Sequence, residues 1–235
     1  MKLSTFITVV IPCKNESKII DLSLSLLNFQ SGVEHLKVIV ADSSDDGITK
    51  HSLLNRKGDK FDLEVISGGL PSVGRNNGSK IVTTPYILFM DSDMFILDNN
   101  LISDSLFMMM KNDLDLLTTK VRTTNGRYNY VFKVFDIVQK LIKPFGPFCL
   151  GGFMMFNKTT FDELGGFDES AIVAEDYLLS KKVIPSKFKL SNKMVFTTPR
   201  RFEDKGIWYM IKLMISSFLN RNNKKFFHNH NTYWG

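Results

Sequence analysis

Four short segments in the N-terminal part of the chain, each predicted to be a strand, constrain its fold most. They cover residues 6–11, 36–41, 62–66 and 86–90. Three of them are largely apolar, as buried strands are, and 62–66 is the exception. Segments of helical character separate them, and this alternation predicts an α/β fold with a mostly parallel, Rossmann-like sheet and helices on both faces. With 235 residues, the chain is long enough for one large domain with a substantial core.

Three helices are expected between these strands. The first has Ser17 as its N-cap and buries one face, which consists of Ile19, Leu22, Leu26 and Phe29. The second covers residues 48–56. Ser72 caps the third, which runs to about residue 82.

The second half of the chain predicts three more strand regions. One strand covers residues 115–124, and another covers 153–156 directly after Gly151–Gly152. Glycines at the start of a strand allow a substrate to approach its edge closely. Residues 188–190 and 193–197 are interpreted as the two arms of a hairpin.

Helices are also expected in the second half. Residues 160–163, Thr-Phe-Asp-Glu, have the pattern of a capping box. Residues 128–142 carry apolar side chains at helical spacing with lysines around them. This helix either packs on the sheet or lies on a membrane with its lysines at the headgroups. Residues 206–219 form a further apolar helix, too short to span a bilayer.

Two carboxylates follow the strand at residues 86–90. Asp91 and Asp93 flank Ser92 at the point where a parallel strand ends. Ligands of open α/β sheets bind at this edge. Mg²⁺ and Mn²⁺ prefer such hard oxygen ligands, and they usually take one or two protein carboxylates together with substrate phosphates. The alternative is an Asp-Ser-Asp turn or a helix cap.

Loops after the other strands converge on the same crevice. The first offers Pro12, Lys14, Asn15 and Glu16, and the second offers Asp42, which could accept a proton from a base imide or serve as a turn residue. Arg75 lies between two glycines four residues apart. It is either a bidentate phosphate donor or a solvated arginine on a helix that packs through its glycines.

Together, several short motifs resemble the family 2 glycosyltransferases of the GT-A fold. The resemblance covers roughly residues 5 to 185. It rests on Val10-Ile11-Pro12 with Asn15-Glu16, on residues 40–47 (VADSSDDG), on residues 74–78 (GRNNG), on residues 90–93 (MDSD), on residues 163–169 (ELGGFDE) and on Glu175-Asp176. Each motif is weak alone, but their order and spacing are specific. Cys13 departs from the small or polar residue that the family often has there.

The resemblance implies a nucleotide-sugar donor of the UDP or GDP type and a divalent cation, Mn²⁺ or Mg²⁺. Asp42 would contact the base and Arg75 would lie near the nucleotide, while Asp91-Ser92-Asp93 would be the metal motif. Gly151 and Gly152 would line the donor-sugar and acceptor site. Asp176 would be the catalytic base of an inverting transfer, with Glu175 orienting the acceptor or supporting the loop. The alternative for this pair is an acidic helix start that complements the helix dipole.

The chain is expected to divide into three parts. Residues 1–98 would bind the nucleotide sugar, residues 99–198 would bind the acceptor as the other half of the same domain, and residues 199–235 would form a basic C-terminal helix and tail. Arg200 and Arg201, after Pro199, are interpreted as a cationic clamp over the diphosphate or as a solvated basic loop.

The net charge of +6 lies mostly in the C-terminal part. From residue 200 onward, seven lysines and arginines stand against two acidic residues. Such a tail favours phosphate, an anionic membrane face or nucleic acid as a partner, or it simply packs on the domain. His228 and His230 are interpreted as tail residues, with a metal-ligand role as the alternative.

Cysteine content and hydropathy indicate the compartment. Cys13 and Cys149 have no metal-site spacing and form no disulfide framework. No secretory signal is visible, and no apolar segment reaches the ~18 residues of a membrane span. We therefore expect a cytoplasmic protein, with peripheral contact at the inner face of a membrane as an option for its tail.

Three function classes follow from these observations. The first is a metal-dependent, inverting glycosyltransferase that builds a surface glycan or polysaccharide. The second is the same chemistry on a nucleic-acid acceptor with a hydroxylated base. The third is a nucleotide-sugar-binding protein without turnover.

Overall fold

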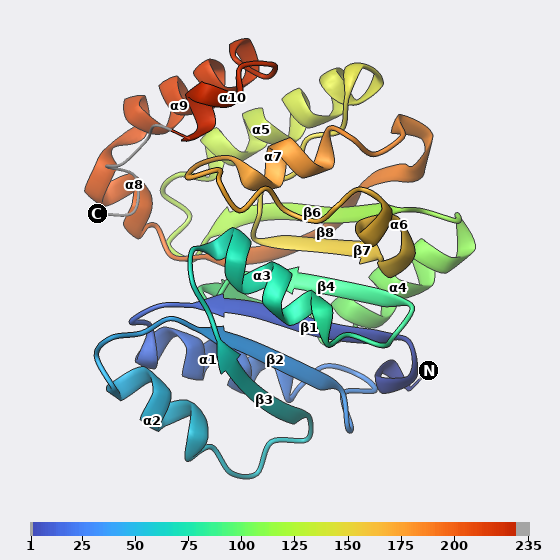
Figure 1. Ribbon diagram of the computed structural model, residues 1–235, viewed down its shortest axis with the longest axis vertical. Helices are drawn as coiled ribbons and strands as arrows, with labels where there is room; N and C mark the ends of the chain where they lie inside the picture. The colour runs from blue at the N-terminus through green and yellow to red at the C-terminus, as the bar shows by residue number, and fades with distance from the viewer. Residues whose placement is uncertain (1, 229–235) are drawn as a thin grey trace.

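The computed structural model describes residues 2–228, apart from the side chain of Lys224, and one continuous sheet runs through it (Figure 1). The strand order is β3-β2-β1-β4-β7-β6-β8-β5. The strands are β1 Ile7–Cys13, β2 Lys37–Asp42, β3 Asp62–Ser67, β4 Tyr86–Met90, β5 Met94–Phe95, β6 Leu116–Thr123, β7 Phe153–Asn157 and β8 Phe188–Thr197. The predicted α/β fold is confirmed.

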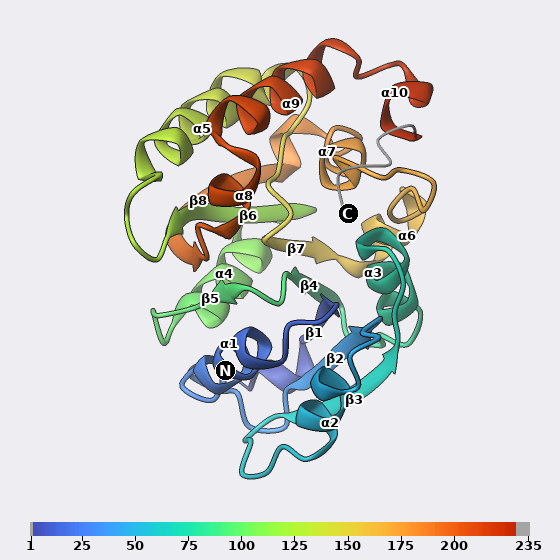
Figure 2. The ribbon, with the colours of Figure 1, turned by 90° about the vertical axis from the view of Figure 1, so that its left-hand side faces the viewer.

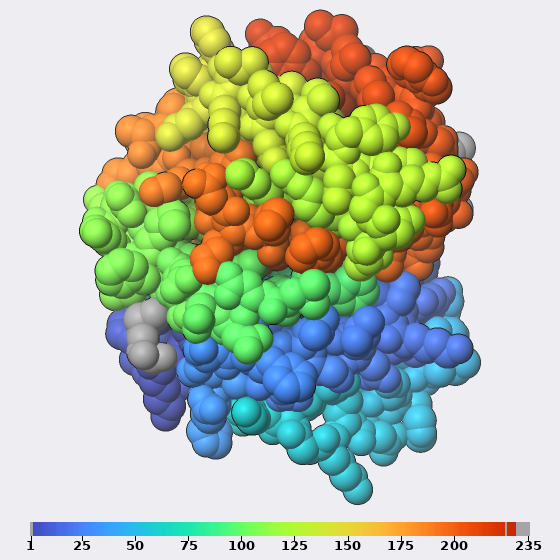
Figure 3. All heavy atoms as spheres, turned by 180° about the vertical axis from the view of Figure 1, so that it is seen from behind, coloured from blue at the N-terminus to red at the C-terminus, as the bar shows by residue number. Residues whose placement is uncertain are grey.

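Helices cover both faces of this sheet, as predicted. The longer helices are α1 Ser17–Leu27, α2 Ile48–Leu54, α3 Pro71–Lys80, α4 Leu101–Lys111, α5 Asn129–Ile142 and α9 Ile207–Leu219. The shorter ones are α6 Lys158–Glu163, α7 Glu175–Ser180, α8 Arg200–Lys205 and α10 Lys224–His228, with 3₁₀ turns at Leu3–Thr5, Lys143–Phe145 and Pro185–Lys187. Helices α3, α6 and α7 lie in front of the sheet in Figure 1, and α1, α4 and α5 lie behind it, where Figure 3 shows them.

The apolar runs of the N-terminal strands are explained by this double cover. Val9 and Ile11 of β1 belong to the large cluster that includes α1, α4 and α5, whereas Val10 belongs to the cluster with α6 and α7. Alternate side chains of a strand point to opposite faces, so both sets must be apolar when helices cover both. The run therefore shows no polar alternation.

Strands β1 to β4 form the parallel unit that the sequence predicted. β1 pairs in parallel with β2 and β4, and β2 pairs in parallel with β3. β7 then runs antiparallel between β4 and β6. The three-part division of the chain at residues 98 and 198 stays a prediction, since one sheet includes strands of the first two parts.

The predicted hairpin at residues 188–197 is wrong. These residues form the single strand β8, which pairs in parallel with β6 and carries an irregularity opposite Thr118 to Lys120. The Ser191 hydroxyl accepts a hydrogen bond from the backbone N–H of Lys193 at 3.2 Å. This local turn bends the chain without reversing it, because a bulge inserts extra residues while the strand continues.

The predicted buried face of α1 is also wrong. The helix buries Ile20, Ser23, Leu24 and Leu27, while Leu22 and Phe29 of the predicted face are exposed. Ser23 lies inside because its hydroxyl donates to the carbonyl oxygen of Met94 at 2.7 Å. Apolar periodicity cannot reveal a buried serine with a tertiary partner. The predicted face therefore lies one residue before the observed one along the helix.

The three predicted N-caps are not the observed ones. Ser17 is the first residue of α1, and Glu16 stands at its N-cap without a capping hydrogen bond. Helix α3 begins with Pro71, whose fixed φ suits a first turn, so Ser72 lies inside the helix. Helix α6 begins earlier than predicted, because Asn157 caps it by accepting a hydrogen bond from the backbone N–H of Thr160 at 3.2 Å.

Helix α5 packs on the sheet, as one of the two alternatives predicted. Phe132 and Phe135 are buried, while Val134 and Ile137 on its outer face are more than half exposed. Helix α9 lies alongside α5 in Figure 2. Over the described residues, every helix is too short or too polar to cross a bilayer.

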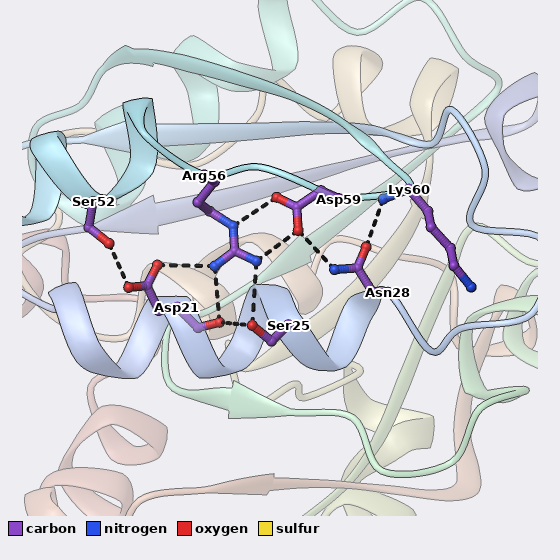
Figure 4. A network of polar contacts seen from close by, with 7 residues as sticks. All are labelled: Asp21, Ser25, Asn28, Ser52, Arg56, Asp59 and Lys60. Atoms are coloured by element: carbon purple, nitrogen blue, oxygen red, sulfur yellow. Dashed lines mark hydrogen bonds and ion pairs between the residues drawn. The ribbon is translucent and has the colours of Figure 1, made fainter.

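A polar network fixes the edge formed by α1 and α2 (Figure 4). Arg56 donates from Nε and Nη2 to the two carboxylate oxygens of Asp59, both at 2.8 Å, and from Nη1 to Asp21 Oδ1 at 3.0 Å. Ser52 donates to Asp21, and Asn28 donates to Asp59. Every nitrogen of this guanidinium therefore has a partner, and the connection between α2 and β3 is held against α1.

Candidate active site

A cavity of about 1050 Å³ lies beside the carboxyl ends of β1 and β4. The predicted site residues that line it are Pro12, Lys14, Asn15, Glu16, Arg75, Asp91, Ser92, Asp93, Gly151, Gly152, Glu175, Asp176, Arg200 and Arg201. They come from six separate stretches of the chain. The crossover topology thus brings the predicted residues together at one edge, as expected for an open α/β sheet.

Arg75 is the centre of the polar end of this cavity. Its side chain is 3% exposed. Nη2 donates to Asp91 Oδ1 at 2.5 Å and Nη1 donates to Glu175 Oε1 at 2.7 Å, while the guanidinium lies over the Phe167 ring. Arg75 is therefore not the solvated arginine of the alternative interpretation. A direct contact between Arg75 and a phosphate stays a prediction.

The glycines beside Arg75 serve packing. A Cβ at Gly78 would lie 2.4 Å from Val10 Cγ1, and one at Gly74 would lie 3.3 Å from Ala41 Cβ. Helix α3 therefore approaches β1 and β2 more closely than a larger residue would allow. This close approach brings Arg75 below the loop that follows β4.

Asp176 lies in the first turn of α7, directly after Glu175, which pairs with Arg75. Its Oδ1 accepts a hydrogen bond from the backbone N–H of Tyr177 at 2.7 Å. Burial raises the pKa of Asp176 to about 7, helped by the negative charges of Glu175 and Asp91 and opposed by Arg75. A carboxylate with such a pKa is well matched to accepting a proton near neutral pH.

Gly151 leaves the space between these groups. A Cβ on Gly151 would lie 3.2 Å from both Arg75 Nη2 and Asp176 Oδ2. A Cβ on Gly152 would lie 2.6 Å from Met94 Cε. The Gly-Gly pair therefore makes room for side chains of the site itself, in addition to any room that it leaves for a substrate.

Asp93 is the second carboxylate after β4. Its Oδ2 accepts hydrogen bonds from the hydroxyls of Thr197 at 2.9 Å and Thr198 at 3.2 Å, at the end of β8. Burial and the negative charge of Asp91 raise the pKa of Asp93, whereas Arg201 and the two threonines lower it. Sequence reasoning missed these two threonines, although their position directly before Pro199-Arg200-Arg201 is a signal that could have found them.

The donor set of Asp91 and Asp93 fits one divalent cation. The two carboxylates repel each other, as the raised pKa of Asp93 reflects, and a cation between them would remove that repulsion. No cluster of three or more His, Cys, Asp or Glu side chains suited to a metal occurs within residues 2–228. A cation here would therefore need oxygen atoms from phosphate or water, which is usual for Mg²⁺.

Glu16 and Arg200 close one side of the cavity. Arg200, at the start of α8, forms an ion pair with Glu16, directly before α1. This pair tethers the start of α8 to the first loop. Whether Arg200 and Arg201 contact a diphosphate stays a prediction.

Asp42 is the predicted site residue that does not line the cavity. It ends β2 beside Cys13 of β1, and its Oδ1 accepts from the Ser44 hydroxyl at 2.6 Å and from the Ser44 backbone N–H at 3.0 Å. The neighbouring Ser43 does line the cavity. The structure thus shows the turn role of Asp42, and its contact with a base stays a prediction.

Asn76 is a structural residue that sequence reasoning missed. Its side chain donates to the Phe167 carbonyl at 2.9 Å and accepts from the Phe167 backbone N–H at 3.0 Å. These bonds hold the segment that leads to Glu175 and Asp176 against α3. A residue one position from Arg75 thus helps to place the catalytic candidates.

The histidines of the tail give no metal ligand in the described part. His228 lies 3.6 Å from Asp168 and contacts the Ser170 hydroxyl, at the end of α10. His230 lies outside the described residues. Buried Cys13, with its pKa raised to about 12 by burial and by Asp42 and Glu16, is an inert thiol.

Comparison with known sequences gives two matches. Residues 8–165 match the family described as Glycosyl transferase family 2. The chain is also 30% identical over 196 residues to the poly(ribitol-phosphate) beta-glucosyltransferase of Bacillus spizizenii. That alignment covers 75% of this chain and 30% of the relative, so the chain spans less than a third of the relative's length.

Solved structures share the fold. Mannosyltransferase PcManGT from Pyrobaculum calidifontis, in complex with GDP-Man and Mn²⁺, matches with a TM-score of 0.65 at 15% identity, covering 82% of this chain and 56% of that one. S. aureus TarS matches with a TM-score of 0.62 at 19% identity, covering 92% and 40%. Its fragment 1-349 in complex with UDP-GlcNAc matches with 0.63 at 20% identity, covering 82% and 58%.

Proposed function

Because the chain belongs to glycosyl transferase family 2, we propose that it transfers a sugar, with inversion, from a UDP- or GDP-sugar to an acceptor hydroxyl. The observation that carries this proposal is the arrangement around Arg75. One buried guanidinium holds Asp91 and Glu175, while Asp176 lies beside it with a pKa of about 7. The proposed base and the two proposed cation ligands thus line the same cavity.

Asp176 would act as the base. The acceptor oxygen attacks the anomeric carbon while Asp176 takes the hydroxyl proton. The bond between that carbon and the diphosphate oxygen breaks, and its electron pair leaves with the nucleoside diphosphate. The hydrogen bond from the Tyr177 N–H to Oδ1 favours a fixed orientation of this carboxylate, which leaves Oδ2 toward Gly151.

Asp91 and Asp93 would hold Mn²⁺ or Mg²⁺, which neutralises the developing charge of a diphosphate leaving group when it is bound. Arg75 fixes Asp91, and the two threonines fix Asp93. Arg200 and Arg201 would add positive charge on the far side of the diphosphate. The Mn²⁺ complex of a structural neighbour with its GDP-Man donor supports this choice of cofactor.

The acceptor class rests on the sequence relative. That protein is a poly(ribitol-phosphate) glucosyltransferase, and the similarity supports a surface glycan or polymer as the product here. Since this chain aligns with only 30% of the relative, the identity of the relative's acceptor cannot be assigned directly to this chain. We therefore propose a glycan-building role and test the donor first.

A donor screen tests the proposal. UDP- and GDP-sugars are incubated with the protein and Mn²⁺ or Mg²⁺, and the release of UDP or GDP is measured, because water slowly replaces a missing acceptor. One donor class should be hydrolysed, and EDTA or Asp93→Asn should suppress the reaction. If no donor is hydrolysed and none binds with either metal, the proposal is wrong.

A further inference from the structure

The cavity does not end at the carboxylates. It continues between α5 and α9, where its walls are apolar. We call this part the apolar limb and define it by Phe135, Val138 and Ile142 of α5 and Leu213, Met214 and Ile215 of α9. Figure 2 shows the two helices side by side above the sheet.

The donor leaves the apolar limb unexplained. Nucleotides, diphosphates and sugar hydroxyls require polar partners, and the cavity supplies these at its other end, around Arg75 and Asp176. The walls of the limb are Phe, Leu, Ile, Val and Met side chains, which offer a nucleotide or a sugar no polar partner. Apolar walls of this kind favour an apolar ligand.

The outer surface of the same two helices has the composition of a membrane interface. On α5, Val134, Ile137 and Leu141 are 53%, 57% and 68% exposed, and Lys133 and Lys140 lie exposed beside them. Trp208 on α9 is 82% exposed. Figure 3 shows α5 as the outermost layer of this face. Lysines and tryptophan around apolar side chains are typical of helices that lie at a bilayer surface.

We propose that the acceptor is a lipid with a hydroxylated polar head, whose apolar chain occupies the limb between α5 and α9. The inference rests on the proposed function and names the acceptor class of the same site. One cavity joins Asp176 to the limb, so an acceptor that fills both parts presents a hydroxyl at one end and a hydrocarbon chain at the other. A second protein copy seated on the limb would have no reason to reach Asp176.

The reaction on this acceptor balances without a further reagent. The head hydroxyl oxygen bonds to the anomeric carbon of the donor, and its proton goes to Asp176. The bond from that carbon to the diphosphate breaks, and the nucleoside diphosphate leaves with the electron pair. The products are a glycosylated lipid and UDP or GDP.

Alkyl glucosides of different chain length test the proposal. Glucose, octyl glucoside and hexadecyl glucoside present the same head on no chain, a short chain and a long chain. Their affinities are measured by calorimetry below the concentration at which they form micelles. Each methylene that enters the limb should tighten binding roughly fourfold until the limb is full. Equal affinity for all three probes overturns the proposal.

Two neighbouring residues of α5 give the matched control. Ile142 lines the limb, whereas Leu141 points outward and is not part of the cavity wall. Ile142→Asn should weaken the long-chain glucoside about tenfold, because an amide without a partner would face the chain. Leu141→Asn should leave the affinity unchanged. Ile215→Asn, at a position that is 50% exposed on α9, repeats the test from the other wall.

Failure of this inference can be separated from failure of the proposed function. Donor hydrolysis without chain-dependent binding would overturn the lipid acceptor and keep the transferase. Chain-dependent binding that Leu141→Asn weakens as much as Ile142→Asn would also overturn it, because adhesion to the outer surface would then explain the affinity. Light scattering completes the test, since dimerisation that Ile142→Asn and Ile215→Asn abolish would assign the limb to a second copy.

Discussion

Two arginines, each held by two carboxylates, differ in what surrounds them. Arg56 is 12% exposed and donates from all three nitrogens to Asp59 and Asp21, with Ser52 and Asn28 completing those carboxylates (Figure 4). Arg75 is 3% exposed and donates from Nη1 and Nη2 to Glu175 and Asp91, while its Nε has no partner among the described residues. All guanidinium nitrogens of the Arg56 cluster have hydrogen-bond partners, whereas one nitrogen of Arg75 has none within the described part of the chain.

The pKa values of the carboxylates show the same difference. Burial alone would raise the pKa of Asp59, but the hydrogen bonds from Arg56 and Asn28 outweigh it and lower the value. Burial and neighbouring negative charges instead raise the pKa values of Asp93 and Asp176 near Arg75. Among the described residues, Arg75 pairs with Asp91 and Glu175 only, and Arg201 offsets just part of the burial of Asp93, so the second cluster favours a proton and an added cation. Such perturbed groups in a cavity are typical of functional sites.

The largest difference is expected for the proposed base. Asp176→Asn keeps the size of the side chain and removes its basicity, so transfer should fall roughly 10²–10⁴-fold. Asp59→Asn at the Arg56 cluster should leave turnover unchanged. Steady-state rates with the donor found by screening measure both. Wild-type turnover in Asp176→Asn would assign the base to another residue.

The two arginines should differ in stability as well. Arg75→Met leaves buried carboxylates without their counter-ion and should lower the free energy of unfolding by about 3–5 kcal/mol. Arg56→Met, at a more exposed and solvated cluster, should lower it by about 1–2 kcal/mol. Urea denaturation of both variants measures this. An equal loss of unfolding free energy in the two variants would mean that the carboxylates around Arg75 depend on their arginine no more than those around Arg56 do.

The pH dependence of stability follows from Asp176. Its pKa in the folded state, about 7, lies above that of an unfolded carboxyl group. Its contribution to stability is therefore fully present below about pH 4 and is lost as the pH rises through 7. Between about pH 4 and pH 8 in EDTA, the free energy of unfolding of the wild type should fall by on the order of 1–3 kcal/mol more than that of Asp176→Asn. A difference in unfolding free energy between the two proteins that stays constant with pH would contradict the raised pKa of Asp176.

A smaller effect is expected at Gly151. Gly151→Ala places a methyl group 3.2 Å from Arg75 Nη2 and Asp176 Oδ2, so these groups must move by a few tenths of an ångström. Since a misplacement of about 1 Å in an active site costs up to about 10²-fold, turnover should fall several-fold with little loss of stability. Comparison of kcat with the unfolding midpoint separates the two effects. An unchanged kcat would show that the room Gly151 leaves beside Arg75 and Asp176 does not matter for turnover.

The local part of this architecture could be predicted from the sequence. The order of strands 6–11, 36–41, 62–66 and 86–90 was confirmed, since apolar runs and their crossovers are local patterns. Asp91 and Asp93 could be named because they directly follow a predicted strand, and the carboxyl ends of parallel strands share one crevice. Asp176 was implied only by the family resemblance of Glu175-Asp176, and its place beside Arg75 did not follow from the strand pattern.

The parts that could not be predicted depend on tertiary partners. Ser23 is buried by a bond to Met94, and Asp93 is held by Thr197 and Thr198 from a strand that lies far along the chain. Arg75 gave no sign that it would pair with Glu175, a hundred residues away. The turn at Ser191 imitates a hairpin, because a strand bulge and a reversal use similar residues.

The carboxylates around Arg75 should bind a cation together with a nucleotide sugar. The intact donor that the hydrolysis screen identifies is titrated into the protein by calorimetry, once in Mn²⁺ and once in EDTA. Asp93→Asn is the site variant, and Asp59→Asn is its matched control. Donor binding should require Mn²⁺ in wild type and Asp59→Asn and should weaken strongly in Asp93→Asn. Equal donor affinity in Mn²⁺ and in EDTA would mean that these carboxylates bind no cation with the donor.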